Sequence, residues 1–267
     1  MAEVQVLARC AALATAFGLA VADTLAWDTP LTDETAPLEL WSHSGDNGPE
    51  NWGRLSSEFS TCTTGQLQSP ISLNTQLATG TTCQPLRFRY RSSSLYATND
   101  GKALRLGYDR GSFLVINGLS YELVEVRFHV PGEHMIDGLV PDGELQLIHG
   151  NNRGDIAIVA IPMMAGPRVN RILRRILEYA PSNQGEKYYG RNIGVNALFM
   201  MPGRKEYFAY MGSLTRPPCT EGVHWYVMRE ALEVDAGDLR RLTQLIAPNS
   251  RPLQPQNGRT VIQTCAP

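Results

Sequence analysis

Residues 125–134 read EVRFHVPGEH, and residues 143–149 read GELQLIH. Residues 123–130 and 144–149 alternate in the way typical of β-strands. Side chains two positions apart on a strand share a face. The pairs that share a face in this way are Arg127 with His129 and Glu144 with Gln146. The sequence therefore predicts two strands that each present a pair of polar side chains on one side.

Short strand-like runs and turn signals continue through the middle of the chain. The predicted strands are Leu86–Tyr90, Ala103–Tyr108, Ser112–Ile116, Tyr121–Val130, Glu144–His149 and Asp155–Ile161. Asn99-Asp100-Gly101 and Asn117-Gly118 are turn sequences of the hairpin type. Two helices are predicted later in the chain, Val169–Tyr179 with a solvated arginine face and Ala236–Ile246 with Asp235 as N-cap. This order favours one sheet-dominated domain over alternating strand–helix units.

Composition excludes some broad classes of function. The chain has 267 residues, is 43% hydrophobic and 19% charged, and carries a formal net charge of −2. These proportions are ordinary for a globular protein with a sizeable core. Because the net charge is small and negative, the overall charge does not favour binding to nucleic acid or to an anionic membrane surface.

The N-terminal segment has a different character. Residues 4–22 are largely apolar and end in Ala20-Val21-Ala22, a small-x-small site of the kind that signal peptidase cleaves. We interpret residues 1–22 as a secretory signal peptide; the alternative is an uncleaved membrane anchor, since about 19 apolar residues just span a bilayer. We predict that residues 23–40 form a linker or extended arm and that residues 41–267 form the domain. We expect a secreted or organelle-lumen protein, anchored to a membrane if the leader is retained.

Cysteine usage agrees with an oxidising compartment. Cys10 lies in the predicted leader, which leaves Cys62, Cys83, Cys219 and Cys265. Four cysteines allow three connectivities, and their spacing does not choose among them. The alternative is four reduced thiols in a cytosolic protein, which the signal-like leader disfavours.

Motifs spread along the domain resemble those of one family. They are WSHSG (41–45), GPENW (48–52), QSPI (68–71), GSLTRPPCTEGVHW (212–225), NSRPLQP (249–255) and NGR (257–259). With the two central stretches, they make the chain similar to the α-class carbonic anhydrases over residues 40–260. The resemblance implies a mainly β (α+β) single domain with a large twisted, mostly antiparallel central sheet and short peripheral helices. It also implies a Cys62–Cys219 disulfide, because secreted and bacterial α-type members pair these positions, and it leaves Cys83 with Cys265.

The sequence departs from this family at the zinc ligands. In the family, H-x-H on one strand and E-x-H on its neighbour supply three imidazoles, and the matching residues here are Arg127, His129 and Gln146. Arginine has only donors and stays protonated, so Arg127 places positive charge where a cation would sit. Gln146 offers a neutral amide oxygen, a poor replacement for imidazole at zinc. His129 alone cannot hold a catalytic ion, so we expect no zinc and no catalytic residues.

The surroundings of these positions match the family more closely. The matching polar residues are Glu133, His134, Glu144 and Thr215, and the matching apolar residues are Ile148, Leu214, Val223 and Trp225. In the family, the threonine orients zinc-bound hydroxide with the first glutamate as its acceptor, and the second glutamate pairs with the histidine. Lys102 occupies the position of the proton-shuttling histidine, where a side chain with a pKa near 10.4 is a poor relay. Arg216 replaces a second pocket threonine and is expected to fill or charge the mouth of the pocket.

A buried Arg127 needs a carboxylate partner. Glu133 is our first candidate and Glu125, on the same strand face, our second, so an arginine-centred network is expected in place of the metal. The histidines expected to be packing or hydrogen-bonded residues, rather than metal ligands, are His43, His129 and His149; His224 is expected to point away from the pocket.

Hypotheses from two classes of function follow. The leading one is a catalytically inactive carbonic-anhydrase-like protein that serves as a binding or structural accessory subunit, with another protein or a membrane complex as its partner and no nucleic acid. In this it is similar to the carbonic-anhydrase-related proteins, some of which combine arginine and glutamine at the first and third ligand positions. The alternative is an active or weakly active zinc carbonic anhydrase with an atypical metal site. A third hypothesis is a small-anion pocket where Arg127 and Arg216 converge near Thr215.

Overall fold

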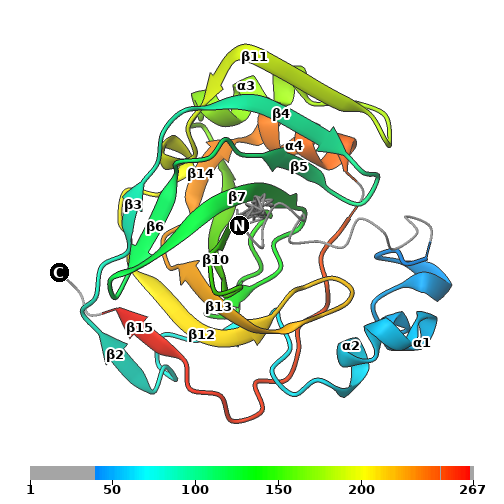
Figure 1. Cartoon of the computed structure of the whole chain (residues 1–267), viewed down its shortest axis with the longest axis vertical. Helices are drawn as coiled ribbons and strands as arrows, with labels where there is room; N and C mark the ends of the chain where they lie inside the picture. The colour runs from blue at the N-terminus through cyan, green and yellow to red at the C-terminus, as the bar shows by residue number, and fades with distance from the viewer. Residues whose placement is uncertain (1–39, 247, 265–267) are drawn as a thin grey trace, which may run out of the picture.

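A computed structural model describes residues 40–246 and 248–264, and its main feature is one 13-stranded sheet (Figure 1). The predictions for the leader, for Cys10 and for all but the last residue of the linker lie outside the described residues.

The strands and helices have the following bounds. The strands are β1 (Ser72–Leu73), β2 (Gly80–Thr82), β3 (Arg87–Arg89), β4 (Ser93–Asn99), β5 (Leu104–Gly107), β6 (Phe113–Ile116), β7 (Leu119–His129), β8 (Met135–Ile136), β9 (Gly143–Gly150), β10 (Ile156–Gly166), β11 (Lys187–Val195), β12 (Tyr207–Ser213), β13 (Glu221–Met228), β14 (Leu232–Asp235) and β15 (Ile262–Thr264). The helices are α1 (Trp52–Leu55), α2 (Thr61–Thr64), α3 (Arg171–Tyr179) and α4 (Ala236–Leu245), with 3-10 turns η1 (Gly45–Asn47), η2 (Ser57–Phe59) and η3 (Ala197–Met200).

The large sheet runs in the order β11-β4-β5-β7-β9-β10-β13-β12-β15-β2, with β3, β6 and β14 attached beside this path. Most neighbouring strands are antiparallel, and the exceptions within this sheet are the parallel pairs β10–β13, β10–β14 and β15–β2. The predicted mostly antiparallel sheet with short helices is confirmed. All six predicted strands are present, and the sequence did not predict the other strands, among them the edge strand β11 and its neighbour β4. β11 is an edge strand with mostly exposed residues and an irregular register, which weakens the alternation that marks a strand.

The pairing of β7 with β9 positions the functional residues. Its register sets Arg127 opposite Gln146 and His129 opposite Glu144, so the two same-face pairs lie side by side at the centre of the sheet. β9 is buried along its whole length, and the last four residues of β7 are buried as well. Polar side chains at these positions must therefore find partners inside the protein.

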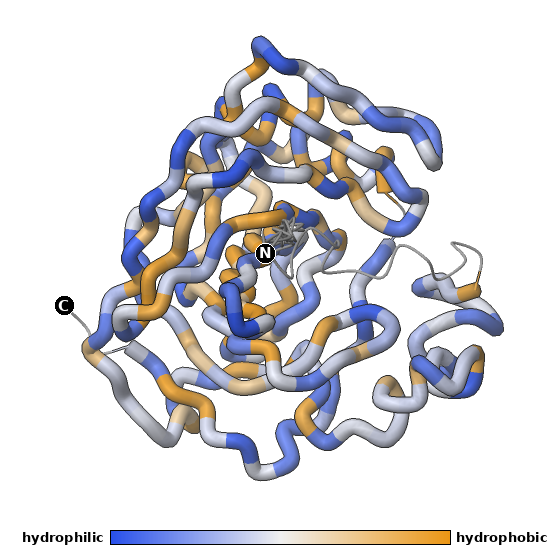
Figure 2. The backbone as a smooth tube through the Cα atoms, viewed as in Figure 1, coloured by the Kyte–Doolittle hydropathy of each residue, from blue (hydrophilic) through white to orange (hydrophobic). Residues whose placement is uncertain are grey.

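Two apolar clusters occupy the sides of the sheet, and hydrophobic residues concentrate on its central strands (Figure 2). The larger cluster includes Leu173 and Ile176 of α3 and Leu242 of α4. Helix α3 begins two residues later than predicted, because the side chain of Asn170 accepts hydrogen bonds from the first-turn amides and caps the helix. The predicted Asp235 cap of α4 is confirmed.

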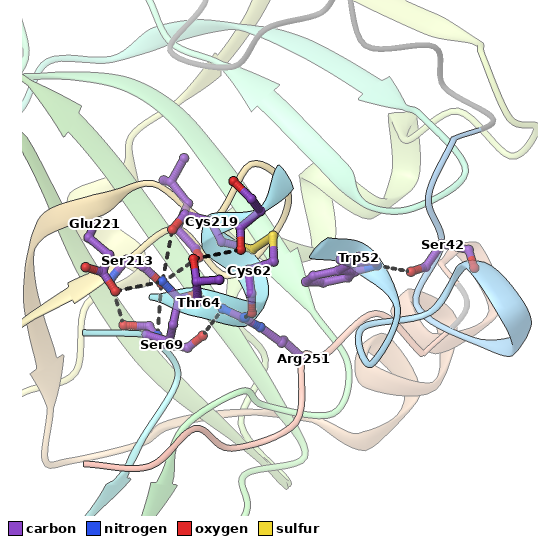
Figure 3. Close-up of a disulfide and its surroundings, with 12 residues drawn as sticks. Ser42, Trp52, Cys62, Thr64, Ser69, Ser213, Cys219, Glu221 and Arg251 are labelled. Carbon is purple, nitrogen blue, oxygen red and sulfur yellow. Dashed lines mark hydrogen bonds between the residues drawn. A yellow bond between two sulfur atoms is a disulfide. The ribbon is translucent and has the colours of Figure 1, made fainter. Parts of the chain in front are cut away.

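A disulfide between Cys62 and Cys219 joins α2 to the segment before β13, with a Cα–Cα distance of 5.0 Å (Figure 3). This confirms the predicted pair; Cys265 lies outside the described residues, and with it the predicted Cys83–Cys265 pair. A structural disulfide indicates an oxidising, non-cytosolic environment. Within the described ranges, none of the helices has the length and apolar character needed to span a membrane.

Candidate functional site

A cavity of about 550 Å³ opens at the end of β7 and contains two of the three positions that match zinc ligands, Arg127 and His129. Arg127 and His129 contribute to its floor from β7, and Arg105 contributes from the neighbouring β5. A recess of about 20 Å³ adjoins it, lined by Gln146, Thr215, Ile148 and other apolar residues. Arg127 and Arg216 line both hollows. The predicted convergence of Arg127 and Arg216 near Thr215 is thus observed.

Arg127 is 5% exposed and pairs with Glu125. Its Nε and Nη2 both donate to Oε1 of Glu125, at 2.9 and 2.6 Å. Our first candidate for the partner, Glu133, was wrong, and the second was right. The physical reason is the strand period, because residues two apart project from the same face and their side chains run together.

The carboxylate of Glu125 also faces a second arginine. Arg105 Nη1 lies 3.5 Å from Glu125 Oε2, and Arg105 Nε lies 3.0 Å from Asp100 Oδ2. Burial acts to raise the pKa of Glu125, but the charges of Arg127, Arg105 and Arg216 outweigh it and the pKa is lowered. Glu125 therefore stays ionised and neutralises the buried arginine.

Gln146, at the third ligand position, is engaged by two carboxylates. Its Nε2 donates to Glu133 Oε2 at 2.7 Å and to Glu144 Oε1 at 2.9 Å. Ionised carboxylates only accept hydrogen bonds, so the amide nitrogen, not the oxygen, must face them. An amide nitrogen is no metal ligand, because its lone pair is delocalised into the carbonyl.

Glu133 has a different partner from the one that the family resemblance implied. Besides Gln146, it accepts a hydrogen bond from the backbone amide of Arg251 at 3.1 Å, and its Oε1 lies 3.5 Å from His129 Nδ1. The hydroxyl of Thr215 makes no hydrogen bond to another described residue. The Gln146 amide donates to an oxygen of Glu133, the carboxylate that would accept from Thr215 in the hydrogen bond that the family resemblance implies.

The predicted pairing of His134 with Glu144 is present and fully buried. His134 Nδ1 lies 3.0 and 3.1 Å from the two Glu144 oxygens, and its Nε2 lies 2.8 Å from the Tyr210 hydroxyl. Tyr210 continues the chain to Ser69 Oγ at 3.0 Å. Burial acts to raise the pKa of Glu144, but His134 and its hydrogen bonds hold it well below the usual range. The sequence did not single out Tyr210, which carries no signal beyond its strand position.

His129 is 4% exposed and has one unsatisfied nitrogen. Its Nδ1 lies 3.1 Å from the backbone oxygen of Asn249, which can only accept, so Nδ1 carries the hydrogen. Its Nε2 is buried without a hydrogen-bond partner among the described residues. The prediction of a hydrogen-bonded core histidine holds for one side of the ring only. Asn249 was not singled out from the sequence, although it lies in the closing NSRPLQP motif.

Further cations line the cavity. The ammonium of Lys102 lies 4.1 Å from the ring centroid of Trp41, and burial lowers its pKa. Burial, and next the charge of Arg127, lowers the pKa of Arg216 to about 9, so Arg216 still carries its charge at neutral pH. No carboxylate of the described residues lies within ion-pair distance of the Arg216 side chain.

His43 both packs and lines the cavity, which its assignment to packing or surface anticipated only in part. Its ring meets Trp41 and Trp52 edge-on, with centroids 5.2 and 5.7 Å apart. Burial, and then the charges of His129, Arg127 and Lys102, lower its pKa to about 3, so His43 is neutral in the ordinary pH range.

The remaining predicted site residues lie behind or away from the cavity. Ile148 and Leu214 line the small recess, whereas Val223 and Trp225 lie within the adjoining apolar cluster and do not line it. His149 is a buried structural residue, as predicted, with Nδ1 3.1 Å from Ala157 O and Nε2 2.5 Å from the Tyr90 hydroxyl. His224 is not among the residues that line either hollow.

Residues 47–265 match the family described as "Eukaryotic-type carbonic anhydrase". The chain belongs to the carbonic anhydrase family. A carbonic anhydrase of Nostoc sp. is 36% identical over 228 residues, which cover 84% of this chain and 85% of that protein. The fold is similar to the α-carbonic anhydrase of Thermovibrio ammonificans solved with the inhibitor sulfanilamide, with a TM-score of 0.80 and 31% identity over 83% of this chain and 98% of that one. It is also similar to dioscorin complexed with ascorbate, with a TM-score of 0.77 and 33% identity over 84% of this chain and 97% of that one.

The residues at the zinc positions of this carbonic anhydrase family member do not fit the ion. Arg127 is a permanent cation in an ion pair, and the Gln146 nitrogen is committed to two carboxylates. Nowhere in residues 40–246 and 248–264 do three His, Cys, Asp or Glu side chains gather as they would around a metal ion. One imidazole nitrogen, that of His129, is too few donors for a catalytic zinc.

Proposed function

We propose that this protein is a catalytically inactive carbonic anhydrase family member that works by binding, as an accessory subunit or ligand-binding protein. The observation that carries the proposal is the pair of opposed positions Arg127 and Gln146, whose donors are both held by carboxylates. Hydration of carbon dioxide at zinc needs neutral donors around the ion and an open fourth position for an acidified water. These two side chains supply neither.

The polar network also opposes a gain of metal. A zinc ion beside Arg127 would meet a fixed positive charge, and moving Arg127 away would break its pair with Glu125. Breaking a buried ion pair costs about 3 to 5 kcal/mol. The network satisfies its own charges without an ion, and this supports the expectation that zinc is absent.

The cavity supports a binding role. Its volume of about 550 Å³ falls in the range of small-molecule sites. Dioscorin, a solved relative with the same fold, was crystallised as a complex with ascorbate. Ascorbate is a small organic anion, so a cavity rich in arginine and lysine in this chain is consistent with a ligand of related chemistry. A protein or membrane-complex partner, as proposed from the sequence, remains compatible with this role.

Metal analysis and a hydration assay on one purified sample test the proposal. We expect well under one zinc per chain and no carbon dioxide hydration above the buffer rate, with and without added zinc. Stoichiometric zinc together with sulfonamide-sensitive hydration would instead establish the alternative, an active zinc enzyme with an atypical site. That alternative draws its support from relatives named as carbonic anhydrases.

A further inference from the structure

We propose that the inner end of the cavity binds a small organic oxyanion that also carries a hydroxyl group, with Arg216 holding the charge and His129 accepting from the hydroxyl. The chemical class is that of the hydroxycarboxylates. This inference rests on the proposed function in one respect, since a bound zinc ion would take the Nε2 of His129.

The first argument is an excess of positive charge. Five basic side chains line the cavity, namely Lys102, Arg105, Arg127, Lys187 and Arg216, against the two acidic side chains of Glu58 and Asp100. Glu125 lies beside the cavity and neutralises Arg127, yet the balance of charge over the described residues that line the cavity remains positive. Cavity walls of one charge sign concentrate small ions of the opposite sign.

Arg216 lines the cavity without an anionic partner among the described residues. It lines both the cavity and the recess, and no carboxylate of the described segments comes within ion-pair distance of it. Burial is the main cause that lowers its pKa; the charges of Arg127 and Arg105 lower it further and so repel the guanidinium, and the charges of Glu125 and Asp100 act in the opposite direction. An oxyanion placed against the guanidinium relieves this repulsion and makes charge-assisted hydrogen bonds.

His129 supplies a second, independent observation. Because Nδ1 donates its hydrogen to Asn249 O, a neutral ring presents a lone pair at Nε2. This buried atom has no partner among the described residues, and the ring lines the same cavity as Arg216. A buried acceptor without a donor is costly, and a ligand hydroxyl would satisfy it.

The walls favour an organic body over a bare inorganic ion. Beyond the charged floor, the cavity is lined by Trp41, Phe59, Ala103, Pro217 and Pro218. The recess of about 20 Å³ holds no more than about one water, whereas the main cavity is large enough for a small organic molecule. The hydroxyl of Thr215, which makes no hydrogen bond to another described residue, offers the ligand a further donor at the recess.

Isothermal titration calorimetry with mandelate and phenylacetate tests the inference, because these two carboxylates differ by one hydroxyl group. We expect mandelate to bind and phenylacetate to bind about five- to tenfold more weakly, the worth of one hydrogen bond to a buried acceptor. Arg216→Gln should weaken mandelate at least about tenfold, since it removes the unpaired charge. Arg216→Lys should retain most of the binding. Arg168→Gln, whose side chain is 81% exposed and lines neither hollow, should leave the binding unchanged.

The outcomes separate this inference from the proposed function when zinc is measured on the same samples. A zinc-free protein that binds neither carboxylate overturns the inference and leaves the proposed function standing. Equal affinity for the two carboxylates overturns the assignment of His129 as the hydroxyl acceptor. Stoichiometric zinc with hydration activity overturns the proposed function itself. Circular dichroism and melting temperature of Arg216→Gln are measured first, and the comparison of mandelate with phenylacetate on the wild-type protein provides the test if that variant does not fold.

Discussion

Arg127 gives two of its hydrogen-bond donors, Nε and Nη2, to a single oxygen of Glu125, two residues earlier on the same strand. The side chain of Arg127 is 6% exposed and that of Glu125 is 17% exposed. A buried arginine at a position that the family uses for a metal ligand is thus neutralised within its own strand.

Glu125→Gln should destabilise the protein strongly. The substitution keeps the size of the side chain but removes the charge that neutralises Arg127, and it leaves a buried cation without a partner. We expect the free energy of unfolding to fall by about 3 kcal/mol, measured by urea denaturation at neutral pH. The matched control is Glu233→Gln, which removes an acid 3.5 Å from the exposed Arg168 and should cost less than about 1 kcal/mol. Equal losses in the two variants would contradict the structural importance of the Arg127–Glu125 pair.

The double substitution Arg127→His with Gln146→His should create a zinc site. It restores three imidazoles at opposed positions of β7 and β9, and it frees Glu133 from the Gln146 amide. We expect close to one zinc per chain by elemental analysis, and carbon dioxide hydration at least about tenfold above the buffer rate, because three histidines leave an open fourth position on zinc.

Each single variant serves as the control for this double substitution. Two imidazoles cannot hold a catalytic ion, so neither Arg127→His nor Gln146→His alone should gain activity. A double variant that folds but takes up no zinc would show that the surroundings, in addition to the ligands, have diverged. Lys102 is expected to limit the rate, because a lysine, with an ordinary pKa of about 10.4, is a poor proton relay at neutral pH.

The sheet and the polar pairs of the site could be predicted from the sequence because they depend on local alternation. Arg127 and His129 share a face whatever their partners are, and the register opposite Gln146 follows from pairing two buried strands. The partner of Arg127 was misjudged because two carboxylates lie within a few residues of it. Only the side-chain directions in the folded protein show that Glu133 accepts a hydrogen bond from Gln146 and does not pair with Arg127.

Other parts of the site depend on contacts between distant segments and leave no local pattern. His43 reaches the cavity because the segment before α1 packs over it through Trp41 and Trp52. Asn249 meets His129 across 120 positions of the chain. A single sequence does not encode such distances in any periodicity, so these residues emerge only from the folded arrangement.

Replacing both Cys62 and Cys219 by alanine should cost stability without changing the fold. The disulfide joins positions 157 residues apart, and cross-linking so long a loop stabilises by roughly 4 to 5 kcal/mol in the chain-entropy model. We expect a loss of this order in the urea unfolding free energy under oxidising conditions. The control is the wild-type protein with a reductant, which breaks this bridge together with the predicted Cys83–Cys265 bridge and should lose at least as much stability as the double variant. A loss below about 1 kcal/mol would show that the denatured chain is already restricted in other ways.

Stability should fall on acidification between pH 6.5 and 5. Burial lowers the pKa of His149 to about 4 and that of His43 to about 3, from an ordinary value of 6.5. A lowered pKa means that the folded state favours the neutral ring, so the unfolded chain binds more protons in this window and the free energy of unfolding rises with pH. Relative to a pH below both pKa values, His149 contributes roughly 3 kcal/mol to the free energy of unfolding at neutral pH, because its side chain is fully buried.

The pH dependence can be assigned by variants, because the carboxylates titrate lower. The pKa of Glu144 is held below its ordinary value of 4.5, so its contribution is present above that pH and is lost only as the pH falls further. Unfolding free energies at pH 7, 6 and 5 should therefore show a shallower slope for His149→Gln than for wild type. His43→Phe should remove a separate part of the slope and leave the His149 part in place. Identical slopes in all three proteins would mean that neither ring takes up a proton when the chain unfolds, and would contradict the neutral buried state of both histidines.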